Sequence, residues 1–284
     1  MRDTAFTIGI MIKLVALDLD GTLLSSFGVL SEEAADTLRK LRKKGITVTI
    51  SSGRPLYSVA GIIPEDCYDY ASCLNGQEIY IKKEDRHLYQ PLLSEEEKTY
   101  LAAYLKKYRM LMHCSINNQG YYLADESHAS FVHLYEDLNA LRHKLAHQPN
   151  YDQDVSYDCD MIRDQKIAKL CFCGFPWTLR KFIAKIDASR FSCFFVNNSW
   201  LEICHLGVSK GSAIRKIMAM DHLEPEECAA FGDGENDLSM FAECGTRVAM
   251  ANAMRSLKKQ ATSIARPNIE DGCAKWLQKH LLEK

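Results

Sequence analysis

The sequence lacks the features typical of membrane, secreted and nucleic-acid-binding proteins. Its 35 lysines and arginines nearly balance its 37 acidic residues, so no overall positive field attracts nucleic acid or an anionic membrane. The apolar stretch near the start lies in MRDTAFTIGIMIKLVALDLD and ends at Asp18. It has no small-residue cleavage site of the kind that ends a signal peptide, and it is too short to span a bilayer. These absences predict a cytoplasmic protein with no nucleic-acid or membrane partner.

Disulfide and zinc frameworks are also missing from the sequence. The eleven cysteines show no disulfide-framework spacing, which favours free, buried thiols in a reducing compartment. The nine histidines are scattered, and no cysteine pair is joined by further ligands at the spacing that a zinc site needs. Residues 1–10 read as an upstream extension, because Met11 would begin the first strand equally well.

What the chain does contain is typical of a globular α/β protein. Its 284 residues, 47% hydrophobic and 25% charged, suffice for one large domain or two smaller ones. A strand at 13–17, a helix over 31–45 and a strand at 46–51 form a βαβ pattern, which predicts a parallel sheet covered on both faces. From residue 84 helices alternate with hairpins, and from Ser209 the α/β pattern returns.

We therefore predict a Rossmann-like, doubly wound parallel α/β core with an inserted α+β domain. The predicted parts are residues 1–83 and 205–284 for the core and 84–204 for the insertion. In such a sheet the ligand binds at the carboxyl ends of the strands.

Four loops at these strand ends are rich in polar residues. They are DLDGT at 18–22, SSGRP at 51–55, SKG at 209–211 and GDGENDLSM at 232–240. Each alone has an ordinary explanation, as a turn, a loop, a solvated lysine or a helix-start acid. Together, in this order and at strand ends, they indicate a site.

These loops resemble the four motifs of the haloacid dehalogenase superfamily. From Met11 onward the chain resembles the Cof-like phosphatase branch, which carries a large (type IIB) cap between the second and third motifs. DLDGTLL and GDGENDLSM are the most specific matches. The resemblance implies a Mg²⁺-dependent phosphatase acting on small phosphorylated metabolites, such as sugar phosphates or phosphorylated cofactors.

The resemblance also implies roles for the aspartates. Asp18 is expected to be the nucleophile that forms an aspartyl-phosphate, and Asp20 the general acid and base. The carboxylates of Asp18 and Asp233 and the main-chain carbonyl of Asp20 are expected to hold magnesium. Asp237 is expected to bind it directly or through water.

The other motif residues are expected to bind the phosphate ester. Ser52 and the amides after it, beginning with Gly53, suit a phosphoryl oxygen. Lys210 would neutralise charge and Asn236 would orient the reacting groups.

Three residues have weaker assignments. Arg54 and Asn75 are expected near the phosphate or the cap hinge, although Arg54 has the alternative of pairing with a nearby acid. Glu202 has two open interpretations, a substrate contact or a bracing role at the interface.

Two other functions remain open at this point. A phosphomutase of the same superfamily also has an acid two residues after its nucleophile, and a catalytically idle binding module could use the same fold. The sequence does not fix the substrate or the oligomeric state.

Overall fold

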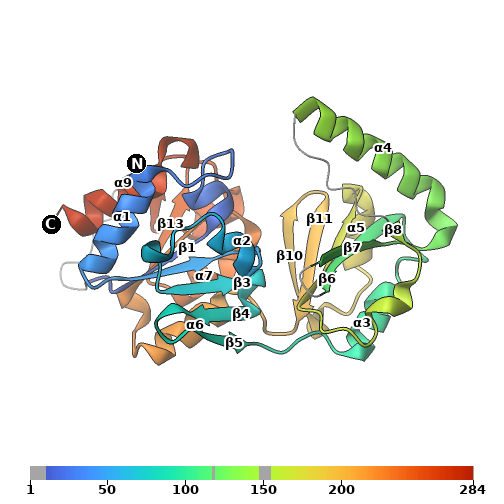
Figure 1. The fold of residues 1–284 in the computed structure, drawn as a ribbon, viewed down its shortest axis with the longest axis horizontal. Helices are drawn as coiled ribbons and strands as arrows, with labels where there is room; N and C mark the ends of the chain where they lie inside the picture. The colour runs from blue at the N-terminus through green and yellow to red at the C-terminus, as the bar shows by residue number, and fades with distance from the viewer. Residues whose placement is uncertain (1–10, 117–118, 147–154, 284) are drawn as a thin grey trace. The chain divides into compact units, whose positions relative to one another are not determined.

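The computed structural model describes residues 11–116, 119–146 and 155–283 (Figure 1). The proposed extension at residues 1–10 lies outside the described residues. The chain divides into two compact units: Pro91–Gly207 forms one, and the residues up to Gln90 together with those from Val208 form the other. Within the described ranges, no helix has the length and apolar character needed to cross a membrane.

Among the described residues, eight strands form the sheet of the larger unit, in the order β14-β13-β12-β1-β2-β3-β4-β5. The six strands from β14 to β3 run parallel, and β4 and β5 add an antiparallel edge. This arrangement confirms the predicted parallel α/β core. The bounds are β1 Leu14–Leu17, β2 Thr47–Ser51, β3 Tyr70–Cys73, β4 Glu78–Ile81, β5 Arg86–Tyr89, β12 Cys228–Gly232, β13 Thr246–Met250 and β14 Ser263–Ala265.

Every residue of β1 and β12 is buried, as expected for central strands covered on both faces. The helices of this unit are α1 Glu32–Lys43, α2 Leu56–Ala60, α6 Lys210–Met220, α7 Leu238–Glu243, α8 Arg255–Gln260 and α9 Gly272–Leu277. Helix α1 corresponds to the helix predicted over 31–45, and Ser31 caps its start, because the Ser31 hydroxyl accepts a hydrogen bond from the amide of Ala34.

The smaller unit is built on a second sheet, in the order β10-β11-β9-β6-β7-β8, antiparallel except for the β7–β8 pair. Helices α3 and α5 contribute to the apolar cluster on one face of this sheet, and α4 contributes to the cluster on the other. The bounds are α3 Glu95–Ala102, β6 Met110–Ile116, β7 Gln119–Leu123, α4 Ala129–Ala146, β8 Val155–Ser156, β9 Lys169–Gly174, α5 Pro176–Ile183, β10 Phe191–Asn197 and β11 Trp200–His205.

The strand pairing places β5 in the larger sheet, whereas the sequence-based division at residue 84 falls just before this strand. The change in sequence pattern at residue 84 falls at the turn of a hairpin. Asp85 adopts a left-handed conformation there (φ 47°), between β4 and β5. Which sheet this hairpin joins depends on strand pairing that local patterns do not encode.

Candidate active site

The four polar loops follow strands or open a helix of the larger unit. Asp18 comes directly after β1, Ser52 after β2 and Asp233 after β12, while Lys210 is the first residue of α6. Because β1, β2 and β12 are adjacent and parallel, their carboxyl ends meet at one edge of the sheet.

Gly21 lets the first loop turn sharply against the fourth. Its φ is +82°, and a Cβ at this position would lie 2.4 Å from Oδ2 of Asp233. Any side chain here would therefore be strained and would displace the carboxylate. The loop is closed by main-chain hydrogen bonds from Leu23 to Asp18 and from Leu24 to Leu19.

Lys210 joins the first and fourth motifs at their carboxylates. Its Nζ lies 2.6 Å from Oδ1 of Asp18 and 2.7 Å from Oδ1 of Asp237, and its side chain is wholly buried. Burial lowers the pKa of Lys210, but the charges of Asp18 and Asp237 outweigh it and raise the pKa above its ordinary value. Lys210 therefore stays protonated, and its charge is shared between two acids.

Three carboxylates gather around this one lysine in the described part of the chain. Asp18, Asp233 and Asp237 each present an oxygen within 4.8 Å of the others. Burial, reinforced by Asp237 and Asp233 and opposed by Lys210, raises the pKa of Asp18 to about 8. Burial and the charge of Asp237 raise the pKa of Asp233 to about 6. One lysine leaves this cluster short of positive charge.

The cluster suits a hard divalent cation such as Mg²⁺. Its donors are all oxygens, and Oδ2 of Asp18 is buried with no hydrogen-bond partner among the described residues. Asp237 is differently placed, because its Oδ2 accepts hydrogen bonds from the amides of Asp233 and Gly234 and its Oδ1 accepts from Lys210. Asp18 and Asp233 are thus better disposed to bind an ion directly than Asp237.

The side chain of Asp20 points to Arg54. The guanidinium donates from Nε to Oδ2 at 2.8 Å and from Nη2 to Oδ1 at 2.7 Å, while the Asp20 side chain is 55% exposed. The alternative that Arg54 pairs with a nearby acid is therefore observed, and that acid is the expected general acid.

The remaining motif residues form a connected network. The hydroxyl of buried Ser52 accepts a hydrogen bond from the amide of Arg54, and its carbonyl accepts from the amide of Asn75. Asn236 donates through Nδ2 to Oδ1 of Asn75 at 3.2 Å, so residues 161 positions apart meet. Gly53 lies in the same loop as Ser52. The predicted site residues of the larger unit are thus brought together.

Glu202 lies in the smaller unit, on β11. It pairs with Lys169 of β9 at 2.5 Å, and both side chains are largely buried. This ion pair supplies an internal partner for Glu202, and the substrate contact stays a hypothesis.

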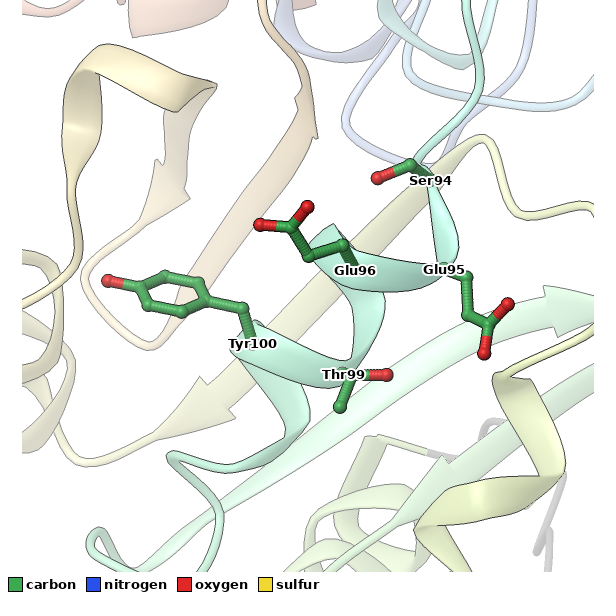
Figure 2. Close-up of a pocket in the computed structure, with 5 residues that line it drawn as sticks. All are labelled: Ser94, Glu95, Glu96, Thr99 and Tyr100. Carbon is green, nitrogen blue, oxygen red and sulfur yellow. The ribbon is translucent and has the colours of Figure 1, made fainter.

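A pocket of about 680 Å³ lies along α3 in the smaller unit (Figure 2). Its two carboxylates are exposed and face arginines, Glu96 with Arg190 at 2.8 Å and Glu95 with Arg163 at 3.8 Å. It brings together none of the expected catalytic groups. The residues that line it are Ser94, Glu95, Glu96, Thr99 and Tyr100.

Sequence reasoning gave no role to two residues that contact the site, one outside the DLDGT loop and one within it. Asn252, after β13, donates to the carbonyl of Gly21, and Thr22 lies 3.5 Å from Oδ1 of Asp233. An isolated asparagine in MANAM carries no recognisable signal, whereas Thr22 belongs to a motif that was already singled out.

Comparison with known proteins agrees with this geometry. A family model described as haloacid dehalogenase-like hydrolase matches residues 15–277. The chain is 28% identical to the HMP-PP phosphatase of Klebsiella pneumoniae (strain 342), covering 88% of each chain.

Solved structures share the fold over nearly the whole chain. A haloacid dehalogenase-like hydrolase from Bacteroides thetaiotaomicron aligns with TM-score 0.73 and 25% identity, covering 94% of this chain and 99% of that one. The HAD subclass IIB sugar phosphatase BT4131 aligns with TM-score 0.77 and 19% identity, covering 94% and 98%.

Proposed function

We propose that this chain, which belongs to the haloacid dehalogenase-like hydrolase family, is a Mg²⁺-dependent phosphatase that works through an aspartyl-phosphate on Asp18. The observation that carries the proposal is the charge pattern around Asp18. One carboxylate oxygen is held by Lys210, and the other is buried without a partner among the described residues. A nucleophile needs this combination of a fixed orientation and a free oxygen.

Asp18, Asp233 and the main-chain carbonyl of Asp20 would hold the magnesium ion. Bound there, Mg²⁺ would supply the positive charge that lets an anionic carboxylate approach a phosphate dianion. Asp237 would act by fixing Lys210 and the amides at 233 and 234, with which it is hydrogen-bonded.

In the first step, an oxygen of Asp18 attacks phosphorus while the ester oxygen leaves and takes a proton from Asp20. In the second step, Asp20 accepts a proton from water as that water attacks the aspartyl-phosphate. Inorganic phosphate leaves and Asp18 is restored. Both steps need a mobile proton on Asp20, and its exposed carboxyl group suits that exchange.

Arg54 would orient Asp20 through the paired hydrogen bonds that join them. Ser52 and the amide of Gly53 would bind phosphoryl oxygens, Lys210 would neutralise transferring charge, and Asn236 with Asn75 would orient the phosphate. The support for these roles is the network that links the loops at one sheet edge.

We propose small phosphorylated metabolites as the substrate class. Two similar proteins are named as an HMP-PP phosphatase and as a sugar phosphatase, which supports a small phosphorylated substrate. A reducing, cytoplasmic setting is consistent with the eleven cysteines, all of which are free.

The test is phosphate release from a panel of sugar phosphates and phosphorylated cofactor precursors, with Mg²⁺ and with EDTA. We expect metal-dependent release by the wild-type protein and none by Asp18→Asn. Phosphate that migrates within a sugar without being released would identify a mutase. Folded, Mg²⁺-loaded protein that does neither would favour the catalytically idle module.

A further inference from the structure

A single turn after β13 contacts both aspartate loops of the site. Nδ2 of Asn252 donates to the main-chain oxygen of Gly21 at 2.7 Å, one residue after Asp20. Two residues later in the turn, the amide of Met254 donates to the main-chain oxygen of Asp233 at 2.9 Å. The turn therefore links the backbone beside Asp20, the expected general acid, to the backbone of Asp233, an expected metal ligand.

Asn252 is itself fixed by a second asparagine. Its Oδ1 accepts a hydrogen bond from the amide of Asn268 at 3.1 Å, and the side chain of Asn268 donates to the main-chain oxygen of Leu24 at 2.9 Å. Both polar atoms of the Asn252 amide are thus used. The loop is held at Gly21 by one asparagine and at Leu24 by the other.

Gly21 is where the loop most needs an external restraint. Glycine has no Cβ to limit its backbone, so its left-handed conformation is one of several that it can adopt. The same missing Cβ allows Asp233 to approach within a distance that no side chain would permit. Gly21 therefore permits the close approach to Asp233 but does not by itself hold the loop in that conformation.

We propose that Asn252 is a positioning residue that holds the Asp18–Asp20 loop at the spacing from Asp233 that a shared divalent cation needs. The proposal rests on the function proposed above and adds a residue that touches neither substrate nor reacting atoms. Its mechanism is a hydrogen bond that supplies the restraint Gly21 lacks. Loss of that bond should loosen the ion site before it affects substrate binding.

The test compares Asn252→Ala with Gln278→Ala in the full-length protein. Gln278 is a matched control, because its side-chain amide also donates a long-range hydrogen bond, to Thr37 at 2.8 Å, but no catalytic loop is involved. Mn²⁺ binding to the metal-free proteins is followed by the electron paramagnetic resonance signal of the free ion. Thermal unfolding, kcat and KM are measured in parallel.

We expect Asn252→Ala to weaken Mn²⁺ binding and to lower kcat by about tenfold each, the lower end of the range for residues that orient metal ligands. KM should stay within about twofold, because no substrate contact is lost. Asn268→Ala removes only the contact to Leu24 and should act in the same direction but less. If Asn252→Ala does not fold, Mn²⁺ binding and kcat of Asn268→Ala test the inference in its place.

Wild-type Mn²⁺ affinity and kcat in folded Asn252→Ala would overturn the inference while leaving the phosphatase intact. Equal losses in Gln278→Ala would also overturn it, because they would reveal a general structural effect. Wild-type protein that neither binds Mn²⁺ nor releases phosphate would overturn the proposed function together with the inference.

Discussion

Each of the two units buries a lysine against carboxylates at its sheet, but the charge balance differs. In the larger unit Lys210 contacts Asp18 and Asp237, and Asp233 completes a group of three acids. In the smaller unit Lys169 forms an ion pair with Glu202.

The pair in the smaller unit is balanced. Oε1 of Glu202 accepts from Lys169 and lies 3.7 Å from Sγ of Cys171 and 3.4 Å from Nε1 of Trp200. Burial and nearby Lys169 lower the pKa of His113 to about 4, so this neighbour adds no charge at neutral pH. In this ion pair of the described residues, one positive charge meets one negative charge.

The cluster in the larger unit has more acidic groups than basic ones, and burial together with this imbalance raises the pKa values of Asp18 and Asp233. Buried carboxylates without enough positive charge retain protons, as the raised pKa values of Asp18 and Asp233 indicate. Burial of charge alone therefore does not mark a reactive site. The informative signs are the excess of one charge and a free ligand atom.

The largest expected effect comes from removing the nucleophile. Asp18→Asn should lower kcat by about 10⁴-fold or more, because no other group can form the covalent intermediate. The matched change in the balanced pair, Glu202→Gln, should leave kcat of the folded protein within about threefold. Steady-state phosphate release measures both, and comparable losses in the two variants would remove the distinction between the units.

The second expected effect is on the pH dependence of stability. Without metal, native Asp18 and Asp233 bind protons more tightly than in the unfolded chain, so the free energy of unfolding should fall as pH rises from about 4 to 8. The decrease should reach several kcal/mol, since one pKa unit is worth about 1.4 kcal/mol.

Denaturant titrations across this pH range measure that slope. Asp18→Asn should flatten it, and Mg²⁺ should restore stability at pH 8. The double variant Lys169→Met with Glu202→Leu should leave the slope nearly unchanged, because it removes both charges of the pair and leaves no buried acid without a cation. A slope that depends on this pair and not on Asp18 would contradict the account.

The third effect is confined to stability. Lys169→Met should destabilise the smaller unit by about 3 kcal/mol, because it leaves Glu202 buried without its cation. Replacing both partners, by Lys169→Met with Glu202→Leu, should recover most of that loss. Chemical unfolding measures the free energies, and a single variant as stable as wild type would show that the pair does not stabilise the unit.

The smallest effect is expected at Arg54. Arg54→Ala should lower kcat by about tenfold, because Asp20 loses the two hydrogen bonds that orient it. Arg42→Ala is a matched control, since Arg42 makes a similar paired contact with Asp69 away from the site. Equal kcat values for the two variants would exclude an orienting role.

Local sequence patterns predicted the elements that carry the chemistry. Ser31 caps α1, and the motifs DLDGT, SSGRP and GDGENDLSM lie at strand ends along one sheet edge as expected. These features depend on nearby residues, so a single sequence contains them.

Other features depend on contacts between distant residues and were not predictable. Pairing with a nearby acid was one alternative for Arg54, but Asp20 was not identified as that acid. The pairing of Asn236 with Asn75 was not foreseen. Asn252 was missed because its partner, the carbonyl of Gly21, is a main-chain atom that no residue type reveals.

The most direct test of the charge imbalance is a calorimetric titration of the metal-free protein with Mg²⁺ at pH 7, in two buffers of different ionisation enthalpy. We predict one ion per chain with proton release, because burial raises the pKa of Asp18 to about 8 and a bound cation would lower it. Binding should disappear in Asp18→Asn and persist in Glu202→Gln. Wild-type protein that binds no Mg²⁺, or binds it equally well without Asp18, would contradict the account.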